Sequence, residues 1–196
     1  MKIGLFFGSF NPIHIGHLII ANTMAETTDL DEVWFVVSPQ NPFKKNQSLL
    51  HEFDRYDMVS AAISDNPIFR VSDIEFNLPK PSYTIDTLAY LSDKHPQNSF
   101  VLIIGEDNLA QFTNWKNYEQ ILNQYELYVY PRPNSTNSNL RNHPKVKLVG
   151  APLLEISATY IRSLVKQEKS IRYLVSKEVE ELIVSRKYYQ SNNPSF

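Results

Sequence analysis

The sequence predicts an α/β fold of three layers, in which helices cover both faces of a parallel sheet. Short runs of consecutive apolar residues recur along the chain, and such runs are typical of strands buried on both faces. Segments with the three- and four-residue spacing of a helix separate these runs. A chain of 196 residues with 42% hydrophobic residues can also bury a sizeable core. We therefore expect a single α/β domain.

In the first half of the chain, three apolar runs alternate with helical patterns. The first run ends at Gly8 and the second before Ser38-Pro39, and these residue types favour turns. Asn66-Pro67 ends one helical pattern, and Thr84 begins another. The expected elements are a strand at 2–8, a helix at 16–29, a strand at 33–37, a loop at 40–47, a helix with Phe53, Tyr56 and Ile63 near one face, a strand at 69–71 and a helix from residue 84.

The second half continues the alternation. The run at 100–104 is the clearest buried strand, and it also ends at a glycine, Gly105. The expected elements are a strand at 100–104, helical turns at 108–122, a strand at 127–130, a surface loop at 135–144, a strand at 146–149 and helices at 159–165 and 176–186. We expect one domain over residues 1–187, with the helices from about 157 as an appended part and a frayed tail at 188–196.

The composition excludes several classes of protein and site. A net charge of -2 and a pI near 6.2 lack the basic surplus typical of nucleic-acid or membrane-surface binding, so small-molecule chemistry is favoured. The absence of cysteine excludes disulfides, thiolate zinc sites, iron–sulfur clusters and a cysteine nucleophile. No apolar stretch reaches ~18 residues, so we expect neither a signal peptide nor a membrane span, and we expect a cytoplasmic location.

Glycine is scarce, and its distribution limits how a nucleotide could be bound. The chain has 5 glycines, and they match neither the G-x-G-x-x-G motif of dinucleotide-binding folds nor the Walker phosphate loop. Any bound nucleotide is therefore held by a different arrangement.

The turn after the first strand carries two histidines at the start of a helix. His14 and His17 are three residues apart and share a helix face. The N–H groups and the dipole of a helix N-terminus attract anions, so we interpret the pair as phosphate ligands. Gly16 would let a nucleotide approach the backbone closely, because it has no Cβ atom. The alternatives are a core histidine with a helix cap, or a zinc site, for which no third ligand is suitably spaced.

A second group of candidates lies near the C-terminus. Ser157 and Thr159 are typical helix N-caps, and Arg162 lies about one turn into the helix that they begin. Together with free N–H groups, these side chains could hold phosphate. Simple capping explains either hydroxyl residue on its own.

A third group begins the helix expected from residue 84. Ser82 and Tyr83 precede Thr84, which is the expected N-cap. Capping alone also explains this pattern.

The remaining candidates follow strands or lie in loops. Asp107 and Trp115 follow the strand at 100–104, and taken alone they could be a helix cap and a core aromatic residue. Arg132 follows the strand at 127–130, and Lys44 lies in the loop after the second strand. An ordinary solvated side chain is the alternative for each of the two cations.

These motifs, in this order, resemble those of the bacterial nicotinate-nucleotide adenylyltransferases of the nucleotidylyltransferase superfamily. His14-Ile-Gly-His17 resembles the (H/T)xGH signature, which class I aminoacyl-tRNA synthetases and pantetheine-phosphate adenylyltransferases share. The segment from Glu155 to Arg162 is similar to the I-S-S-T-x-I-R motif of the family. The resemblance extends from Ile3 to about residue 186. The chain departs from the family pattern at Phe7, Asn11, Phe43 and Ala158.

The resemblance implies a Rossmann-like fold and adenylyl transfer from ATP to nicotinate mononucleotide, giving deamido-NAD and pyrophosphate in NAD biosynthesis. The alternatives are a nicotinamide mononucleotide or pantetheine-phosphate adenylyltransferase, and a non-catalytic nucleotide sensor of the same fold. Mg²⁺ would be carried with ATP, so no metal ligand from the protein is expected. The expected partners are these small molecules, without nucleic acid or membrane, and the sequence leaves the oligomeric state open.

The resemblance also implies three groups of site residues. The catalytic residues would be His14, His17 and Arg162. ATP would be bound by Gly8, Ser9, Phe10, Gly16, Gly105, Asp107, Ser157 and Thr159. The nicotinate nucleotide would be bound by Lys44, Ser82, Tyr83, Thr84, Trp115 and Arg132.

Overall fold

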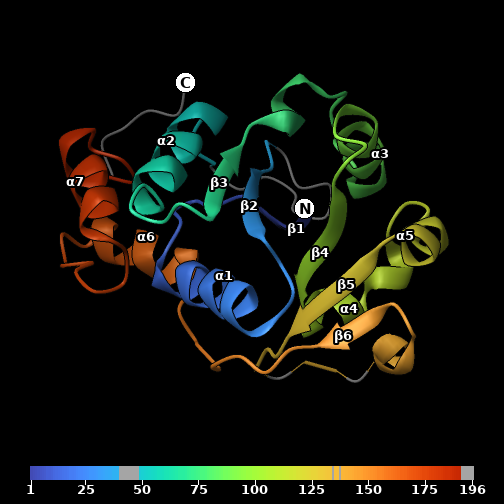
Figure 1. Cartoon of the computed structure of the whole chain (residues 1–196). Coiled ribbons are helices and arrows are strands. Elements are labelled where there is room, and N and C mark those ends of the chain that lie inside the picture. The colour runs from blue at the N-terminus through green and yellow to red at the C-terminus, as the bar shows by residue number, and fades with distance from the viewer. Residues whose placement is uncertain (40–48, 134, 137, 191–196) are drawn as a thin grey trace.

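A parallel sheet of six strands forms the centre of the computed structural model, which describes residues 1–39, 49–133, 135–136 and 138–190. Across the sheet the strands follow the order β3-β2-β1-β4-β5-β6, and all neighbouring strands are parallel (Figure 1). They span Lys2–Gly8 (β1), Glu32–Val37 (β2), Phe69–Ser72 (β3), Ser99–Gly105 (β4), Glu126–Tyr130 (β5) and Val146–Leu148 (β6). Each of the strands expected from the sequence is present.

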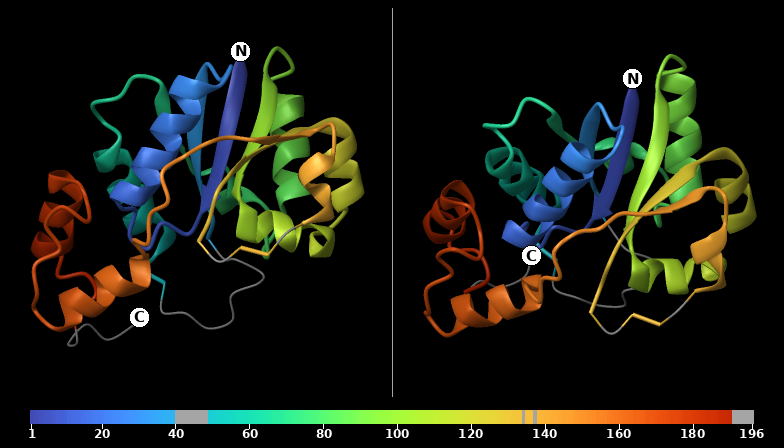
Figure 2. Two further views of the ribbon diagram at one scale, coloured as in Figure 1. Left: turned by 90° about the horizontal axis from the view of Figure 1, so that it is seen from below. Right: turned by 60° about the horizontal axis from the view of Figure 1, so that its bottom comes forward.

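Helices cover both faces of this sheet, which confirms the predicted three-layer α/β class. Figure 2 shows helices on either side of the strands. The helices of one core layer span Ile15–Thr27 (α1), Glu52–Ala62 (α2), Ala158–Lys166 (α6) and Lys177–Ser185 (α7). Those of the other layer span Thr84–Lys94 (α3), Glu106–Ala110 (α4) and Tyr118–Gln124 (α5). Within the described ranges, no helix is long and apolar enough to cross a membrane.

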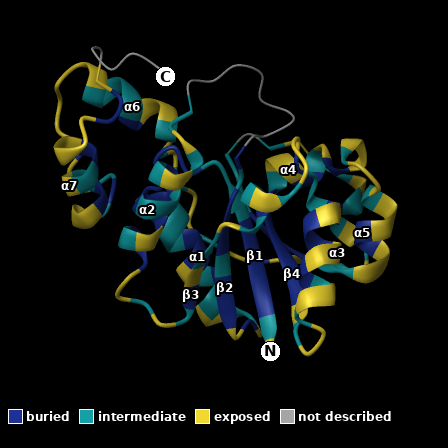
Figure 3. Ribbon diagram, turned by 90° about the horizontal axis from the view of Figure 1, so that it is seen from above, coloured by how far each residue is buried: buried dark blue, intermediate teal, exposed yellow. Residues whose placement is uncertain are grey.

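The alternation of side chains along the strands divides the core between these two layers. Leu5 and Leu102 pack into the layer of α3, α4 and α5. Their neighbours Phe6 and Ile103 pack into the layer of α1 and α2. All four side chains are buried, and Figure 3 shows most of β1 and β4 in the colour of buried residues. Burial on both faces explains why the strands appear in the sequence as continuous apolar runs.

The order of the strands reverses at β1, and this reversal positions the site. β2 and β3 lie on one side of β1, while β4, β5 and β6 lie on the other. The chain leaves β1 toward α1 in one layer and leaves β4 toward α4 in the opposite layer. The two connections therefore separate and open a crevice beyond the carboxyl ends of the strands, where folds of this kind bind ligands.

Some helix details differ from the expectation. The N-cap of α3 is Tyr83, so Thr84 is the first helical residue instead of the cap. Phe53 of α2 was expected near one face with Tyr56 and Ile63, but it is 58% exposed, whereas Ile63 and Met58 are buried. The buried face of α2 also carries Arg55, and a charged residue on this face obscures its apolar periodicity.

Short 3₁₀ helices lie in two segments that were expected to be continuous helical turns and a loop. The helical turns expected at 108–122 are divided into α4, a 3₁₀ helix and α5. The surface loop expected at 135–144 also contains a turn of 3₁₀ helix. The 3₁₀ helices span Ile74–Asn77, Phe112–Asn114 and Asn139–Asn142.

The end of the described chain packs against the domain. The frayed tail expected at 188–196 was therefore placed to begin too early in the sequence. Tyr188 and Tyr189 are buried in the layer of α2 and α7. The Tyr189 hydroxyl donates to Asn11 Oδ1 at 2.9 Å, and the Tyr188 hydroxyl donates to Asp54 at 2.6 Å. The surrounding polar sequence gave no periodic signal for this packing. Residues 191–196 lie outside the described part of the chain.

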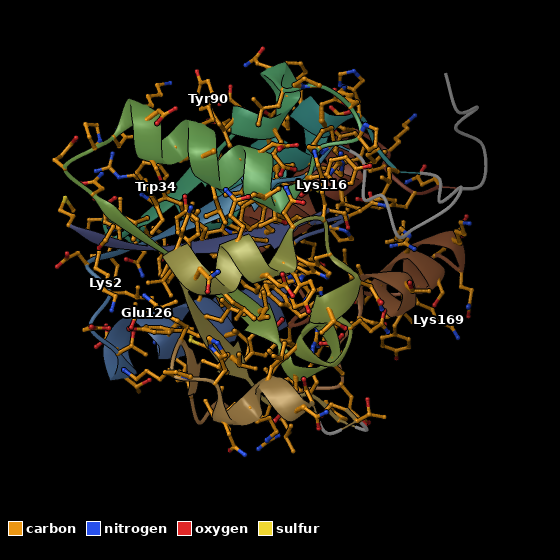
Figure 4. The ribbon with its side chains drawn as sticks, turned by 90° about the vertical axis from the view of Figure 1, so that its right-hand side faces the viewer. Lys2, Trp34, Tyr90, Lys116, Glu126 and Lys169 are labelled. Atoms are coloured by element: carbon orange, nitrogen blue, oxygen red, sulfur yellow. The ribbon has the colours of Figure 1, made fainter. Side chains whose placement is uncertain are left out.

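Charged groups pair with one another at the amino ends of the strands. Lys2 Nζ lies 2.8 Å from Asp29 and 2.5 Å from Glu126, and it donates to the Tyr128 hydroxyl at 2.8 Å. Figure 4 labels Lys2 and Glu126 close together, away from Lys116. This cluster ties β1, β5 and the segment after α1 together at the edge of the sheet opposite the crevice.

We expect Leu102→Ala to lower the free energy of unfolding by about 2–5 kcal/mol, because it leaves a cavity at a fully buried position of a central strand. Urea denaturation followed by circular dichroism measures the change. Leu153→Ala is the matched control, since Leu153 is 62% exposed and its loss should change the free energy by less than about 0.5 kcal/mol. Equal effects of the two substitutions would contradict the described core.

Candidate active site

A cleft of about 420 Å³ opens at the carboxyl ends of β1 and β4, where the strand order reverses. Most of the site residues expected from the sequence line it, namely Gly8, Ser9, Phe10, His14, His17, Ser82, Tyr83, Thr84, Gly105, Asp107, Trp115, Arg132, Ser157, Thr159 and Arg162. Gly16 instead lines a small neighbouring pocket, also bordered by His14 and His17. Lys44 and Phe43 lie outside the described residues. One cleft thus brings together segments from both ends of the chain.

The two histidines stack on each other at the N-terminus of α1. Their ring centroids lie 3.7 Å apart, and the His14 N–H donates to His17 Nδ1 at 3.3 Å. A Cβ atom on Gly16 would lie 3.1 Å from His14 Nδ1, so this glycine makes room for the imidazole of His14. The expected approach of a nucleotide to the backbone at Gly16 stays a prediction.

His14 is neutral at physiological pH. Burial, together with the nearby guanidinium of Arg132, lowers the pKa of His14 from 6.5 to about 4. The side chain is buried, and among the described residues its Nδ1 has no hydrogen-bond partner. An anion bound in the cleft would give the ring a partner and oppose the effect of Arg132 on its pKa.

The backbone after β1 has a strained conformation at the floor of the cleft. Phe10 has a φ of 44°, in the left-handed region, which costs a non-glycine residue about 1–2 kcal/mol. Its ring is buried and packs edge-on against His17, with 5.1 Å between centroids. A Cβ atom on Gly8 would lie 2.7 Å from this ring, so only glycine leaves the space that it needs. Such strain at a cleft is typical of a functional loop.

The N-terminus of α6 forms a second wall of the cleft and touches this loop. Ser157 is the N-cap, and its hydroxyl accepts from the N–H of Tyr160 at 3.2 Å. Arg162 donates to the carbonyl of Asn11 at 2.8 Å and to the Thr159 hydroxyl at 3.2 Å. The guanidinium of α6 is therefore anchored directly to the turn that carries the histidines.

The N-terminus of α3 forms a third wall. Tyr83 has extended backbone angles at the cap position and no side-chain capping bond, so the first N–H groups of the helix, from Thr84, lack a cap. Lys116 Nζ lies 4.5 Å from the centre of the Tyr83 ring and 2.9 Å from Asp86. Trp115 lines the same cleft and also packs against Phe112. This wall combines aromatic surface with a positive helix end.

Asp107 and Arg132 face each other where β4 and β5 end. Asp107 Oδ1 lies 3.8 Å from Arg132 Nε, a buried atom that has no hydrogen-bond partner among the described residues. A Cβ atom on Gly105 would lie 2.4 Å from Asp107 Oδ1, so a larger residue there would displace the Asp107 carboxylate from its present position. Gly105 is the N-cap of α4, and Asp107 lies in its first turn, so the capping interpretation of Asp107 is wrong.

Sequence reasoning missed several lining residues, among them the buried carboxylate of Glu75. Its carboxylate accepts hydrogen bonds of 2.9 Å from the hydroxyls of Ser82 and Thr87. Burial raises the pKa of Glu75, and the hydroxyls of Ser38, Thr87 and Ser82 oppose this rise. No motif marks this position, because its partners belong to other elements. The other missed lining residues include Ser38, Asn108, Lys116, Tyr130 and Ile156.

The cleft is built to bind a ligand with several negative charges. The N-termini of α1, α3 and α6 all reach it, and each attracts anions. Three cations, Lys116, Arg132 and Arg162, line the same space, against the carboxylates of Glu75 and Asp107. Phosphate groups fit this combination of donors better than a neutral ligand does.

In an NMR titration we expect the His14 imidazole to stay neutral down to about pH 5 and to take up a proton near pH 4. Inorganic tripolyphosphate should raise this pKa, because an anion stabilises the imidazolium. In the unfolded chain this histidine has a pKa near 6.5, so it takes up a proton at a higher pH than in the folded chain. The free energy of unfolding that the neutral, buried His14 contributes above pH 6.5 is therefore lost as the pH falls from 6.5 toward 4. Titration of His14 near 6.5 without ligand would contradict the described burial.

Sequence comparison places this cleft in a known family. A family model described as cytidylyltransferase-like matches residues 5–164. A protein of Cytophaga hutchinsonii, named probable nicotinate-nucleotide adenylyltransferase, is 83% identical over 191 residues, covering 97% of this chain and 100% of that protein. A protein of Flavobacterium psychrophilum with the same name is 51% identical, covering 97% of this chain and 100% of that protein.

Solved structures share the fold at much lower sequence identity. The nicotinic acid mononucleotide adenylyltransferase of Plasmodium falciparum, complexed with NaAD, has a TM-score of 0.80 and 20% identity, covering 96% of this chain and 97% of that chain. The same protein complexed with APC has a TM-score of 0.79. The structural likeness shows the fold alone, whereas the sequence matches show the family. The chain belongs to the cytidylyltransferase-like family and, within it, to the nicotinate-nucleotide adenylyltransferases.

Proposed function

We propose that this chain transfers the adenylyl group of ATP to nicotinate mononucleotide, giving deamido-NAD and pyrophosphate. The observation that carries the proposal is the convergence of three helix N-termini and the guanidinium groups of Arg132 and Arg162 on one cleft. This arrangement suits two substrates that together carry four phosphate groups. Relatives named for this activity match nearly the whole chain at 83% and 51% identity, which supports the assignment.

The reaction is an in-line displacement at the α-phosphorus of ATP. An oxygen of the mononucleotide phosphate forms a new bond to the α-phosphorus. At the same time, the bond between the α-phosphorus and the oxygen of the leaving pyrophosphate breaks. The transfer needs no covalent intermediate, so positioning and charge neutralisation carry most of the catalysis. His14 and His17 contact the ATP phosphates and the charge that develops on them. Ser157, Thr159 and Arg162 hold the β- and γ-phosphates at the start of α6.

The wall formed by α3 selects the acceptor. The uncapped N-terminus at Thr84 attracts a ring carboxylate more strongly than a neutral ring amide. The resulting difference in binding free energy is about 0.3–1 kcal/mol. Tyr83 and Trp115 offer aromatic surface for the pyridine ring in the same wall. Arg132 lies at the end of β5, where it holds the phosphate of the mononucleotide.

Mg²⁺ enters this cleft with ATP in our proposal. Among the residues that the structure describes, no group of three His, Asp or Glu side chains could hold a metal ion. The Glu75 carboxylate already accepts from two hydroxyls, so Asp107 is the carboxylate placed to accept from water ligands of the ion. This donor set fits an ion that keeps several waters and binds mainly to phosphate oxygens, where it neutralises charge.

Pyrophosphate release tests the proposed function and its alternatives. Purified protein with ATP and Mg²⁺ should release pyrophosphate when nicotinate mononucleotide is added. The value of kcat/KM should be lower with nicotinamide mononucleotide, and lower again with pantetheine phosphate. A preference for either of these acceptors would replace the proposed substrate. Binding of ATP and mononucleotide without pyrophosphate release would identify a non-catalytic sensor.

We expect His17→Ala to lower kcat about 10²-fold or more, which corresponds to a loss of about 2.7 kcal/mol of transition-state stabilisation. The reason is that the substitution removes a donor next to the reacting phosphates. Steady-state pyrophosphate release measures the change. His143→Ala is the control, because His143 does not line the cleft and its substitution should leave kcat unchanged. Turnover of His17→Ala near the wild-type rate would refute the role given to His17.

A further inference from the structure

A fully buried arginine lies beneath the loops of the site. Arg55 of α2 is 0% exposed. Its Nη1 donates to the carbonyls of Ser9 at 2.6 Å and of Ser38 at 2.8 Å. Its Nε donates to the carbonyl of Leu50 at 2.9 Å, and its Nη2 to that of Pro39 at 3.2 Å. One side chain thus connects the segments that follow β1 and β2, and both segments reach the cleft.

Among the described residues, Arg55 has no direct carboxylate partner. Within the described residues, no Asp or Glu oxygen lies within 4.0 Å of its guanidinium, and residues 40–48 contain no acidic residue. The carboxylate of Glu52 attracts the guanidinium of Arg55 without contacting it, and this carboxylate accepts a hydrogen bond of 2.9 Å from Lys80. Burial lowers the pKa of Arg55, yet an arginine stays protonated at neutral pH. Buried arginines are usually paired, so an unpaired one needs an explanation.

The bond from Arg55 to Ser9 also sets the direction of the next N–H group. In a planar trans peptide, the C=O and N–H bonds point in opposite directions. Because the Ser9 carbonyl points toward Arg55, the N–H of Phe10 points away from it. Within the described ranges this N–H has no hydrogen-bond acceptor, and both Ser9 and Phe10 line the cleft. The same bond supports the left-handed conformation of Phe10.

We propose that Arg55 is a positioning residue for the triphosphate of ATP. Its guanidinium holds the loop after β1 so that the N–H of Phe10 is directed into the cleft. The charge of this guanidinium, which no carboxylate contacts among the described residues, attracts the phosphates from beneath the loop. This proposal rests on the proposed function, because it takes ATP to be the ligand of this loop. A purely structural arginine would stabilise the loop without favouring charged ligands over neutral ones.

The dependence of affinity on ligand charge distinguishes these two roles. Calorimetry would measure the binding of ATP, inorganic tripolyphosphate and adenosine to the wild type, Arg55→Met and Arg55→Lys. We expect Arg55→Met to weaken ATP and tripolyphosphate at least tenfold and to change adenosine binding by less than twofold. Arg55→Lys keeps the charge but not the fork of donors, so it should recover part of the lost affinity for both charged ligands.

Arg186→Met is the matched control. Arg186 contacts Asp54 and Asp57, which are neighbours of Arg55 on α2, so its loss loosens the same helix without removing the buried charge. We expect a lower unfolding temperature for this variant and an unchanged ratio of ATP affinity to adenosine affinity. A change in this ratio as large as that of Arg55→Met would assign the effect to the packing of α2 and overturn the proposal.

Three other results would overturn it. They are unchanged ATP affinity in Arg55→Met, an equal loss of ATP and adenosine affinity, and equal losses in the Met and Lys variants. If the variants do not fold, the assigned Nε–H signal of Arg55 in the wild-type NMR spectrum gives the test. This signal should shift with tripolyphosphate and not with adenosine, and an unmoved signal refutes the proposal. Wild-type pyrophosphate release is assayed separately, so a failure of the proposed function is distinguished from a failure of this inference.

Discussion

The parallel pairing of β1 with β4 is the constraint on which the site depends. Both strands end at the same edge of the sheet, and the chain leaves them toward opposite layers. The crevice between the two connections therefore exists before any functional side chain is considered. Residues 8–17 and 156–162 are far apart in the sequence, yet both reach this crevice. The ion pairs of Lys2 lie at the opposite, amino ends of the strands, away from the crevice.

Polar contacts to one residue, Asn11, join the segments that meet there. Its carbonyl accepts from Arg162, and its side-chain oxygen accepts from the Tyr189 hydroxyl and from the N–H of Leu50. Asn11 stands where the resemblance described above implies that aspartate is frequent. An amide oxygen accepts these bonds as a carboxylate oxygen would, so the departure preserves the contacts. It also omits a negative charge next to Arg162, which leaves that guanidinium more attractive to phosphate.

The strands and the fold class could be predicted because their signals are local. An apolar run such as 100–104 is recognisable without knowledge of its neighbours. The motifs around His14 and Ser157 also indicated segments of the site, since their residue types suit phosphate. Glu75 and Arg55 could not be found in this way. Their partners are hydroxyls and carbonyls of distant segments, and the buried position of a backbone carbonyl leaves no mark in the sequence. The packing of the C-terminal tyrosines depends on such distant partners too.

The site holds several groups in unfavourable states, and the core supplies the stability that maintains them. Two buried nitrogen atoms, Nδ1 of His14 and Nε of Arg132, have no hydrogen-bond partner among the described residues. Phe10 adds about 1–2 kcal/mol of backbone strain. Phosphate oxygens placed among these groups would supply the missing acceptors, and the donors need little rearrangement to meet them. Donors oriented in advance stabilise developing charge without a cost of reorganisation during the reaction. In the proposed reaction, this strain and desolvation keep the donors oriented, so removing them would make the domain more stable and the adenylyl transfer slower.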